Sequence, residues 1–287
     1  MKVKTAAKIN LALDVVGRLN HGYHAIESVF QTVGIYDEVS VELSDSIDIE
    51  VSCDVPEEFA SADPIPCDEH NIAYKAAHFY LNRSGAGRGC RIHIKKGIPS
   101  QAGMGGGSTD AAAVLYILQR LIGKEIPPSE VIGADVPFFL TGGTAYVAGI
   151  GEDIEPIADY SGRILVIAKG SEGVSTAEAY GRIDKLVKPV HPDTDALVEA
   201  INNKPDEAYK YFGNLFEAAI QLPEVGDIEE KMKACGALNA VMTGSGSAVF
   251  GLFESRDTAE RCAEKLAADG YFAQVCETVS KTFIETE

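Results

Sequence analysis

The chain has 287 residues, of which 46% are hydrophobic and 24% are charged, and its formal net charge is −18. Such a length and composition are typical of a globular protein with one large core or two smaller ones. The negative charge argues against nucleic acid or an anionic membrane as a partner. No apolar run approaches the ~20 residues of a membrane span or follows the charged start as in a signal peptide, so we expect a cytoplasmic protein.

The first half of the chain is predicted to form strands around two helices. Between residues 9 and 15, apolar side chains alternate along one face of a strand, which leaves Lys8, Asn10 and Ala12 on the other face. Lys8 and Asn10 are therefore expected to project together. Further elements are expected as strands at 25–33, 38–43, 47–51, 90–95 and 144–148, a hairpin turn at Asn20, His21 and Gly22, and a helix at 71–81.

A glycine-rich loop leads from the strand at 90–95 into a second helix. Its glycines are Gly103, Gly105, Gly106 and Gly107. They lack side chains, so the backbone can approach a ligand closely. Ser108 is the predicted N-cap of the helix, because apolar residues recur at helical spacing from Ala111 onward. A helix N-terminus behind a glycine turn presents unpaired amides, so we expect a polyphosphate site, with a mobile glycine loop as the alternative.

Two common phosphate motifs do not fit this loop. A Walker A loop requires a lysine directly after its last glycine, whereas Ser108 follows Gly107. A dinucleotide fingerprint follows an early and wholly apolar strand. The strand at 90–95 instead alternates apolar and polar residues and lies almost a third of the way along the chain. Another kind of phosphate-binding loop is therefore expected.

The second half of the chain is predicted to place helices on an antiparallel sheet. It begins with a wholly apolar strand at 164–168. The expected helices lie at 176–186, 194–201, 206–220, 227–235 and 258–269, and the expected strands at 240–243, 247–253 and 272–278. This mixture of segregated helices and strands indicates the α+β class.

Five short motifs occur in order along the chain. They are Ala6-Ala-Lys-Ile-Asn-Leu11, Gly22-Tyr-His24, Gly105-Gly-Gly-Ser-Thr-Asp-Ala-Ala112, Gly133-Ala-Asp-Val-Pro-Phe-Phe139 and Thr243-Gly-Ser-Gly-Ser247. Together they resemble the GHMP kinases, a family of small-molecule kinases. The Gly-Tyr-His motif is similar to that of the members whose alcohol substrate carries cytidine diphosphate. The resemblance implies a domain at 1–153 similar to ribosomal protein S5 domain 2, a ferredoxin-like domain at 154–287, and a site between them.

The resemblance also implies a reaction, the transfer of the γ-phosphoryl group of ATP to an alcohol. Such a transfer needs alignment, neutralisation of charge and a base for the hydroxyl proton. Asp135 stands at the family's position for that base, although its local sequence also fits a turn or helix-capping aspartate. Lys8 is expected beside Asp135, where its charge would keep the carboxylate ionised and favour a developing alkoxide.

Two groups of binding residues follow from the same resemblance. The ATP-binding group is Asn71, Lys96, Pro99, Gly103, Met104, Gly105, Gly106, Gly107, Ser108 and Thr109. The substrate-binding group is Asn10, Tyr23, His24, Thr176 and Tyr180. In this group Tyr23, His24 and Tyr180 are expected to hold a cytosine ring by stacking and hydrogen bonds. Mg²⁺ is implied as well, with the hydroxyl of Ser108 or Thr109 as its candidate ligand.

Several alternatives remain open from the sequence. The chain could be a GHMP kinase of the mevalonate or homoserine kinase type, a catalytically silent nucleotide-binding paralogue, or an RNA-associated module, and the net charge of −18 argues against the last. A monomer and a homodimer are both compatible with the sequence. One departure from the family pattern concerns the segment between Leu121 and Gly133, which is shorter than usual and lacks an additional helix.

Overall fold

The computed structural model describes residues 1–19, 22–59 and 64–286, so the predicted turn at Asn20 and His21 lies outside the described residues. The strands are β1 (Lys2–Arg18), β2 (His24–Ser44), β3 (Ile49–Asp54), β4 (Gly89–Lys95), β5 (Thr144–Gly149), β6 (Asp153–Pro156), β7 (Ile164–Lys169), β8 (Gly213–Asn214), β9 (Asn239–Met242), β10 (Val249–Phe253), β11 (Phe272–Glu277) and β12 (Phe283–Glu285). The helices are α1 (Ile72–Ser84), α2 (Gly106–Ile122), α3 (Val136–Thr141), α4 (Thr176–Ile183), α5 (Thr194–Asn203), α6 (Phe216–Ala219), α7 (Pro223–Ala234) and α8 (Arg256–Ala268), with 3₁₀ turns η1 (Glu57–Phe59) and η2 (Pro205–Tyr211).

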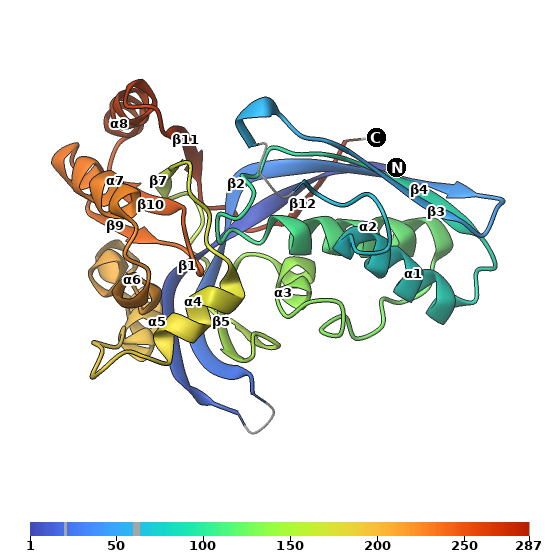
Figure 1. Ribbon diagram of the computed structural model, residues 1–287, viewed down its shortest axis with the longest axis horizontal. Coiled ribbons are helices and arrows are strands. Elements are labelled where there is room, and N and C mark those ends of the chain that lie inside the picture. The colour runs from blue at the N-terminus through green and yellow to red at the C-terminus, as the bar shows by residue number, and fades with distance from the viewer. Residues whose placement is uncertain (20–21, 60–63, 287) are drawn as a thin grey trace.

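The first sheet is built on the long antiparallel pair of β1 and β2. Over the described residues its order is β12-β1-β2-β4-β3, with β5 and β6 continuing from β2 and β8 lying beside β1. Helices α1, α2 and α3 cover one face of this sheet (Figure 1). Val41 of β2, Ile92 of β4 and Leu115 of α2 share one core there, which removes their apolar surface from water.

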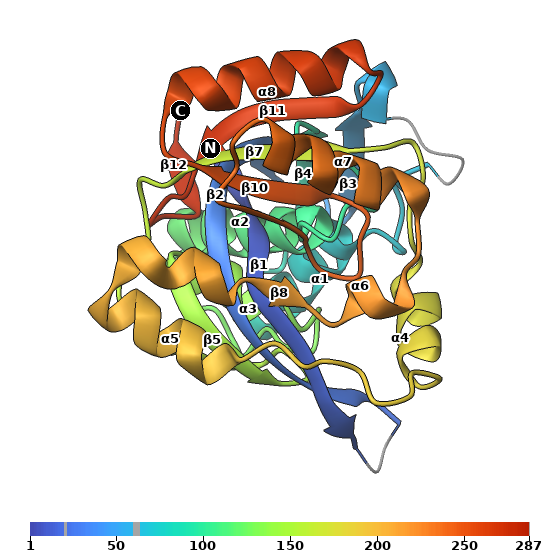
Figure 2. The ribbon, with the colours of Figure 1, turned by 90° about the vertical axis from the view of Figure 1, so that its left-hand side faces the viewer.

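The second sheet has the strand order β11-β7-β10-β9, and all of these neighbours are antiparallel. Its strands follow the chain as strand, helices, two strands, helix and strand, which is the ferredoxin-like pattern. Helices α7 and α8 cover one face (Figure 2), where they share a core with Val166 and Ala168. Leu165 and Ile167, which point the other way, share a core with Ile9 and Leu11 of β1. The apolar run predicted as a strand is therefore buried on both faces and ties the two sheets together.

The predicted α+β class, with one part at each end of the chain, is confirmed by this arrangement of two sheets that each carry helices on one face. The boundary between residues 153 and 154 stays a prediction, because β8 and β12 from the second segment pair with β1. Both chain ends therefore lie near each other beside the first sheet (Figure 1). No helix in the part of the chain that the structure describes is long and apolar enough to cross a membrane.

The prediction of a helix at 206–220 is wrong. This segment forms η2, then the short strand β8, and then the single turn of α6. The side-chain amide of Asn214 donates to the carbonyl oxygens of Met242 at 2.7 Å and Gly244 at 2.8 Å. Pairing of Gly213 with Ala12 in the first sheet adds to these contacts. Such tertiary hydrogen bonds outweigh the local preference for helix.

Two acidic side chains of the second half, Glu217 and Glu229, lie together in a partly buried position, with Lys233 Nζ 3.8 Å from Glu229 Oε2. Burial, with the charge of Glu217 in second place, raises the pKa of Glu229 from its ordinary 4.5 to about 8. Glu229 Oε1 is buried without a hydrogen-bond partner among the described residues, which agrees with a carboxyl group that prefers to be neutral.

This raised pKa predicts a pH-dependent stability. Between pH 4.5 and about 8 the folded chain holds a proton on Glu229 that the unfolded chain has released, so stability falls as pH rises through this window. The side chain of Glu229→Gln is neutral at every pH, so this variant avoids the cost of a buried carboxylate. Its free energy of unfolding is expected to exceed that of the wild type by about 1–3 kcal/mol at pH 8.5, with no gain at pH 5. Thermal melts of both proteins at the two pH values test this. A difference in melting temperature that does not change with pH would contradict it.

Candidate active site

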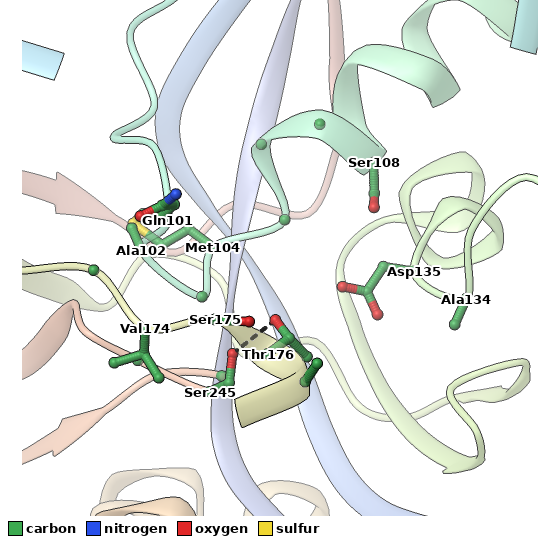
Figure 3. A pocket seen from close by; sticks show the side chains of 18 of the residues that line it. Gln101, Ala102, Met104, Ser108, Ala134, Asp135, Val174, Ser175, Thr176 and Ser245 are labelled. Atoms are coloured by element: carbon green, nitrogen blue, oxygen red, sulfur yellow. Dashed lines mark hydrogen bonds between the residues drawn. The ribbon is translucent and has the colours of Figure 1, made fainter. Parts of the chain in front are cut away.

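A cleft of about 1440 Å³ gathers the residues that the sequence singles out. Its walls come from β1, from the glycine loop before α2, from the start of α3, and from α4 with the turn at 244–246 (Figure 3). The two predicted binding groups and the predicted catalytic pair all line it, with the exception of Thr109. Segments that are far apart in the chain therefore meet in one space.

The glycine loop runs along the cleft wall, but the helix behind it begins earlier than predicted. Helix α2 starts at Gly106, and Gly105 occupies the N-cap position with φ 71° and no side-chain cap. The prediction that Ser108 is the N-cap is therefore wrong. A glycine takes this place because the left-handed conformation is costly for other residues, and because a Cβ on Gly105 would lie 2.7 Å from the ring of Phe139. Within the described part of the chain, no side chain caps the first amides of α2 at the cleft.

Ser108 and Thr109 follow each other on α2 but face different surroundings. The hydroxyl of Ser108 points into the cleft toward Asp135 (Figure 3). Thr109 is fully buried, its hydroxyl donates to the carbonyl oxygen of Ala6 at 2.8 Å, and it lies 2.5 Å from the hydroxyl of Thr5. Of these two hydroxyls only that of Ser108 is available to a ligand.

Lys8 and Asp135 meet in the cleft although they are 127 positions apart in the sequence. Lys8 Nζ lies 3.9 Å from Asp135 Oδ2 and donates to Asn10 Oδ1 at 2.7 Å. Burial lowers the pKa of Lys8, and the charge of Asp135 partly offsets this effect. Asp135 stands at the N-cap position of α3 without making a side-chain cap, and its carboxylate is turned toward the cleft (Figure 3). The arrangement pairs a buried ammonium with an accessible carboxylate.

Lys96 lies in the cleft wall with its charge already engaged by the protein. Its Nζ donates to Asp110 Oδ2 at 2.8 Å and to Asp37 Oδ2. Burial alone would lower the pKa of Lys96, but the two carboxylates outweigh burial and raise the pKa above its usual value. The family resemblance places Lys96 in the ATP-binding group, but nothing in the local sequence indicates that Asp37 pairs with it.

Asn71 caps helix α1 on the side of the cleft beyond the glycine loop. Its side chain accepts from the amide of Ala73 at 2.8 Å and donates to the carbonyl oxygen of Pro66 at 2.7 Å. Ile65 and Pro66 also line the cleft. Pro99 and Met104 of the predicted ATP-binding group line it as well. Asn71 therefore fixes the segment that forms this end of the cleft, and its contact with a nucleotide stays a prediction.

Aromatic side chains gather at the opposite end. The ring of His24 stacks on Tyr180 with centroids 4.7 Å apart, and Tyr180 meets Phe216 edge to face at 5.0 Å. Burial, followed by the charge of Asp135, raises the pKa of Tyr180 to about 12. Tyr23 stands at the rim with 61% of its surface exposed. One face of Tyr180 is thus covered by His24, and the expected stacking of Tyr23 and Tyr180 around a base stays a prediction.

Asp184 is a cleft residue that the sequence analysis missed. Its carboxylate lies 2.7 Å from Nε2 of His24 and 3.6 Å from a guanidinium nitrogen of Arg18. The hydrogen bond from His24 holds the pKa of Asp184 below its usual range. A signal was present, because Asp184 follows Tyr180 by four residues and such residues share one helix face. Asp184 and Tyr180 together hold His24 against α4.

The motif at 243–247 is a turn that contacts β1, α4 and the glycine loop. The hydroxyl of Thr243 accepts from the amide of Asn10 at 2.9 Å. The hydroxyls of Ser245 and Thr176 are 3.1 Å apart, a contact drawn in Figure 3. A Cβ on Gly103 would collide with the carbonyl oxygen of Thr243, so the glycine loop rests directly on this turn. Its residues thus support the glycine loop, β1 and α4 at once.

This combination of an open glycine loop, a lysine and aspartate pair, and a sheet on either side of the cleft is that of a GHMP kinase. The family models for the GHMP kinases N terminal domain and the GHMP kinases C terminal region match residues 71–143 and 196–271. The chain belongs to the GHMP kinase family.

Relatives with a common name match almost the whole chain. The chain is 40% identical over 275 residues to the 4-diphosphocytidyl-2-C-methyl-D-erythritol kinase of Clostridium tetani, covering 93% of this chain and 95% of that protein. A protein of the same name from Clostridium perfringens is 39% identical over 286 residues, with 96% of each chain covered. A crystal structure of 4-(cytidine 5'-diphospho)-2C-methyl-D-erythritol kinase aligns with a TM-score of 0.80 and 33% identity over 97% of this chain and 99% of that chain.

Homoserine kinase from Cytophaga hutchinsonii aligns with a TM-score of 0.76, 18% identity, and coverage of 99% of this chain and 96% of that chain, which shows the shared fold alone. The predicted family, and with it an ATP-using phosphotransferase that acts on an alcohol group, are confirmed by these comparisons.

Proposed function

We propose that this chain phosphorylates the 2-hydroxyl of 4-diphosphocytidyl-2-C-methyl-D-erythritol with ATP, a step of the non-mevalonate pathway to isoprenoid precursors. The observation that carries the proposal is the contact of Lys8 with Asp135, 3.9 Å apart, in a cleft that joins an open glycine loop to an aromatic end. The relatives named for this activity match over almost the whole chain. The cytoplasmic location and a monomeric or dimeric state stay predictions.

The glycine loop is proposed to hold the phosphates of ATP. Apart from Met104, residues 103–107 are all glycines. The amides at the start of α2 have no side-chain cap among the described residues. Backbone amides at a helix N-terminus favour anionic oxygens through their dipoles and hydrogen bonds. In a chain with a net charge of −18, such fixed dipoles supply local positive potential without a lysine in direct contact.

The cleft also fits a magnesium ion. Mg²⁺ prefers oxygen ligands and binds nucleotides through one or two protein groups and the phosphates. The hydroxyl of Ser108 and the carboxylate of Asp135 face the same space (Figure 3), so Ser108 is the proposed protein ligand, whereas the buried hydroxyl of Thr109 does not fit. When bound, the ion neutralises the charge that gathers on the transferred phosphoryl group.

Asp135 is proposed as the base and Lys8 as its partner. The carboxylate is accessible from the cleft and makes no capping bond, so it can take the proton of the substrate hydroxyl. The ammonium of Lys8 lies close enough to keep this carboxylate ionised before the reaction and to favour negative charge on the attacking oxygen. Because Lys8 is buried, its attraction is less screened than at the surface.

The aromatic end is proposed to bind the cytidine part of the substrate through Tyr23, His24 and Tyr180, with Asn10 and Thr176 nearer the reacting group. Replacing Tyr180 by alanine is expected to raise KM for this substrate by roughly tenfold, since loss of a ring stacked on a base costs on the order of 1–3 kcal/mol. KM for ATP should stay within about twofold. Steady-state kinetics with each substrate varied in turn measure both values.

Tyr211→Ala is a suitable control for Tyr180→Ala, because Tyr211 is a partly exposed tyrosine that does not line the cleft. It should leave both KM values unchanged. A raised KM for ATP with an unchanged KM for the cytidine substrate would remove Tyr180 from the base-binding end.

A direct assay tests the proposed activity. Purified enzyme, ATP and Mg²⁺ are supplied with the cytidine diphosphate alcohol, with mevalonate or with homoserine, and ADP release is coupled to NADH oxidation. Turnover is expected with the cytidine compound alone. Turnover with mevalonate or homoserine instead would favour another GHMP kinase activity, and a chain that turns over none of the three would fit a silent paralogue. The lysine and aspartate pair argues against that last outcome.

A further inference from the structure

One buried side chain outside the cleft joins the two ends of the proposed site. Asn214 of β8 is 6% exposed and is not among the described residues that line the cleft. Strand β8 pairs with Ala12 and Leu13 of β1 and leads into α6 (Figure 2). Because this segment forms a strand instead of the helix that its sequence predicts, the side chain of Asn214 reaches the turn at 243–247.

The side-chain amide of Asn214 makes three hydrogen bonds to the backbone. Its Nδ2 donates to the carbonyl oxygens of Met242 at 2.7 Å and Gly244 at 2.8 Å, and its Oδ1 accepts from the amide of Phe216 at 3.0 Å. A primary amide offers two N–H donors and an acceptor oxygen, and asparagine carries it on the shortest stem. Neither aspartate nor serine can therefore make all three bonds.

The two carbonyl groups that Asn214 holds belong to the neighbours of Thr243, which reaches the proposed catalytic lysine. The hydroxyl of Thr243 accepts from the amide of Asn10 at 2.9 Å and donates to Asn10 Oδ1 at 3.3 Å. Asn10 Oδ1 also accepts from Lys8 Nζ at 2.7 Å. A continuous series of contacts thus leads from Asn214 to the ammonium group beside Asp135.

The same turn touches the glycine loop directly, backbone against backbone. A Cβ on Gly244 would lie 2.6 Å from the carbonyl oxygen of Gly103, and a Cβ on Gly103 would collide with the carbonyl oxygen of Thr243. Segments packed this closely transmit a displacement from one to the other. A shift of the carbonyl groups that Asn214 holds would therefore shift the loop that is proposed to bind the phosphates of ATP.

The third bond of Asn214 supports the aromatic end. The amide that Oδ1 accepts belongs to Phe216, the first residue of α6. Phe216 is 1% exposed, borders the cleft, and meets Tyr180 edge to face with ring centroids 5.0 Å apart. One side chain thus holds both the turn behind the glycine loop and the residue behind Tyr180.

We propose that Asn214 is a positioning residue that keeps the glycine loop and the aromatic end aligned with each other without contacting either substrate. The inference rests on the proposed function, in which the phosphates of ATP and the cytidine part of the substrate occupy these two ends. The two donated bonds position the turn, and through it the loop and Lys8. The accepted bond positions Phe216 behind Tyr180. Phosphoryl transfer depends on such alignment of donor and acceptor.

Asn214→Asp separates the donated bonds from the accepted one. A carboxyl group has nearly the same shape and keeps the acceptor for Phe216, but it donates at most one bond and cannot hold both carbonyl groups. We expect kcat/KM for ATP to fall roughly 10- to 100-fold, since a displacement of about 1 Å in a positioning segment costs about 10²-fold. KM for the cytidine substrate should stay within about threefold, because the support of Tyr180 remains.

Asn214→Leu tests the accepted bond. Leucine removes all three bonds, so KM for the cytidine substrate should rise about 5- to 10-fold in addition to the loss of kcat/KM for ATP. An Asn214→Leu protein with the same KM for the cytidine substrate as Asn214→Asp would overturn the role of this bond.

Asn239→Asp provides a matched control for Asn214→Asp. The side chain of Asn239 also donates to a backbone carbonyl oxygen, that of Tyr209 at 2.9 Å, and accepts from a backbone amide, that of Ala240 at 2.9 Å. Asn239 lies outside the cleft. Its replacement is expected to lower the melting temperature and to leave kcat/KM for ATP unchanged.

Adenosine distinguishes positioning of the loop from a general structural defect. It lacks the phosphates that the loop is proposed to hold, so its inhibition constant against ATP should stay within about twofold in Asn214→Asp. A rise in this constant equal to the loss of kcat/KM for ATP would overturn the proposal, as would a kcat/KM for ATP within about threefold of the wild type. Should Asn214→Asp fail to fold, Asn214→Ser decides by the same two measurements, because its hydroxyl is neutral and donates a single bond.

The wild type separates this inference from the proposed function. A wild type that uses ATP as proposed, together with an Asn214→Asp protein that matches it, refutes the positioning role alone. A wild type that binds no ATP refutes the proposed function, and the positioning role with it.

Discussion

Replacing Asp135 by asparagine is expected to lower kcat by roughly 10²- to 10⁴-fold, the range in which a general base contributes. Asparagine has nearly the same shape and leaves the start of α3 unchanged, but it cannot accept the hydroxyl proton. KM for ATP and for the cytidine substrate should therefore stay within about threefold of the wild type. Lys8 also loses the charge that raises its pKa, so the pKa of this buried ammonium should fall further in the variant.

The thermal stability of Asp135→Asn distinguishes the two roles that the local sequence allows. A helix-capping aspartate would lower the melting temperature when replaced and leave turnover nearly intact. Asp135 makes no side-chain cap to α3, so we expect a melting temperature within about 2 °C of the wild type together with the large loss of kcat. Near-normal turnover in a folded Asp135→Asn protein would remove Asp135 from the role of base.

The sequence predicted the parts of the site that depend on local pattern. The strand alternation around Lys8 and Asn10 placed both side chains on one face, and the structure joins them by a hydrogen bond of 2.7 Å. The glycine loop before an amphipathic helix was found in the same way. Family resemblance then linked these segments to Asp135, which no periodicity could have done, because a contact between residues 127 positions apart depends on the whole fold.

The parts that the sequence missed depend on tertiary contacts. Asp37 lies in a strand whose pattern is that of an ordinary half-buried β segment, and nothing local indicates that its carboxylate will hold Lys96 and the start of the loop. Asp184 likewise acts through His24 of a distant strand. The N-cap of α2 was misplaced at Ser108 because serine is a common cap, whereas the close approach of Phe139 requires glycine at Gly105.

The second large effect is expected at that glycine. Replacing Gly105 by alanine should lower kcat/KM for ATP by roughly 10²-fold, because a displacement of about 1 Å in a positioning segment costs that much. Gly105 has φ 71°, and an added Cβ would lie 2.7 Å from the Phe139 ring and 3.3 Å from Cγ of Lys8. The substitution therefore shifts the loop, the catalytic lysine, or both. Steady-state kinetics with ATP varied at saturating cytidine substrate measure the effect.

Gly123 at the other end of α2 provides a matched control. It has a similar left-handed backbone with φ 80°, but an added Cβ would find open space. Alanine at either position carries the strain of that conformation, about 1–2 kcal/mol, so both variants should melt a few degrees below the wild type. Only Gly105→Ala should lose activity with ATP. Equal losses of kcat/KM in both variants would mean that the helix as a whole, and not the contact of Gly105 with Phe139 and Lys8, determines how the loop holds the nucleotide.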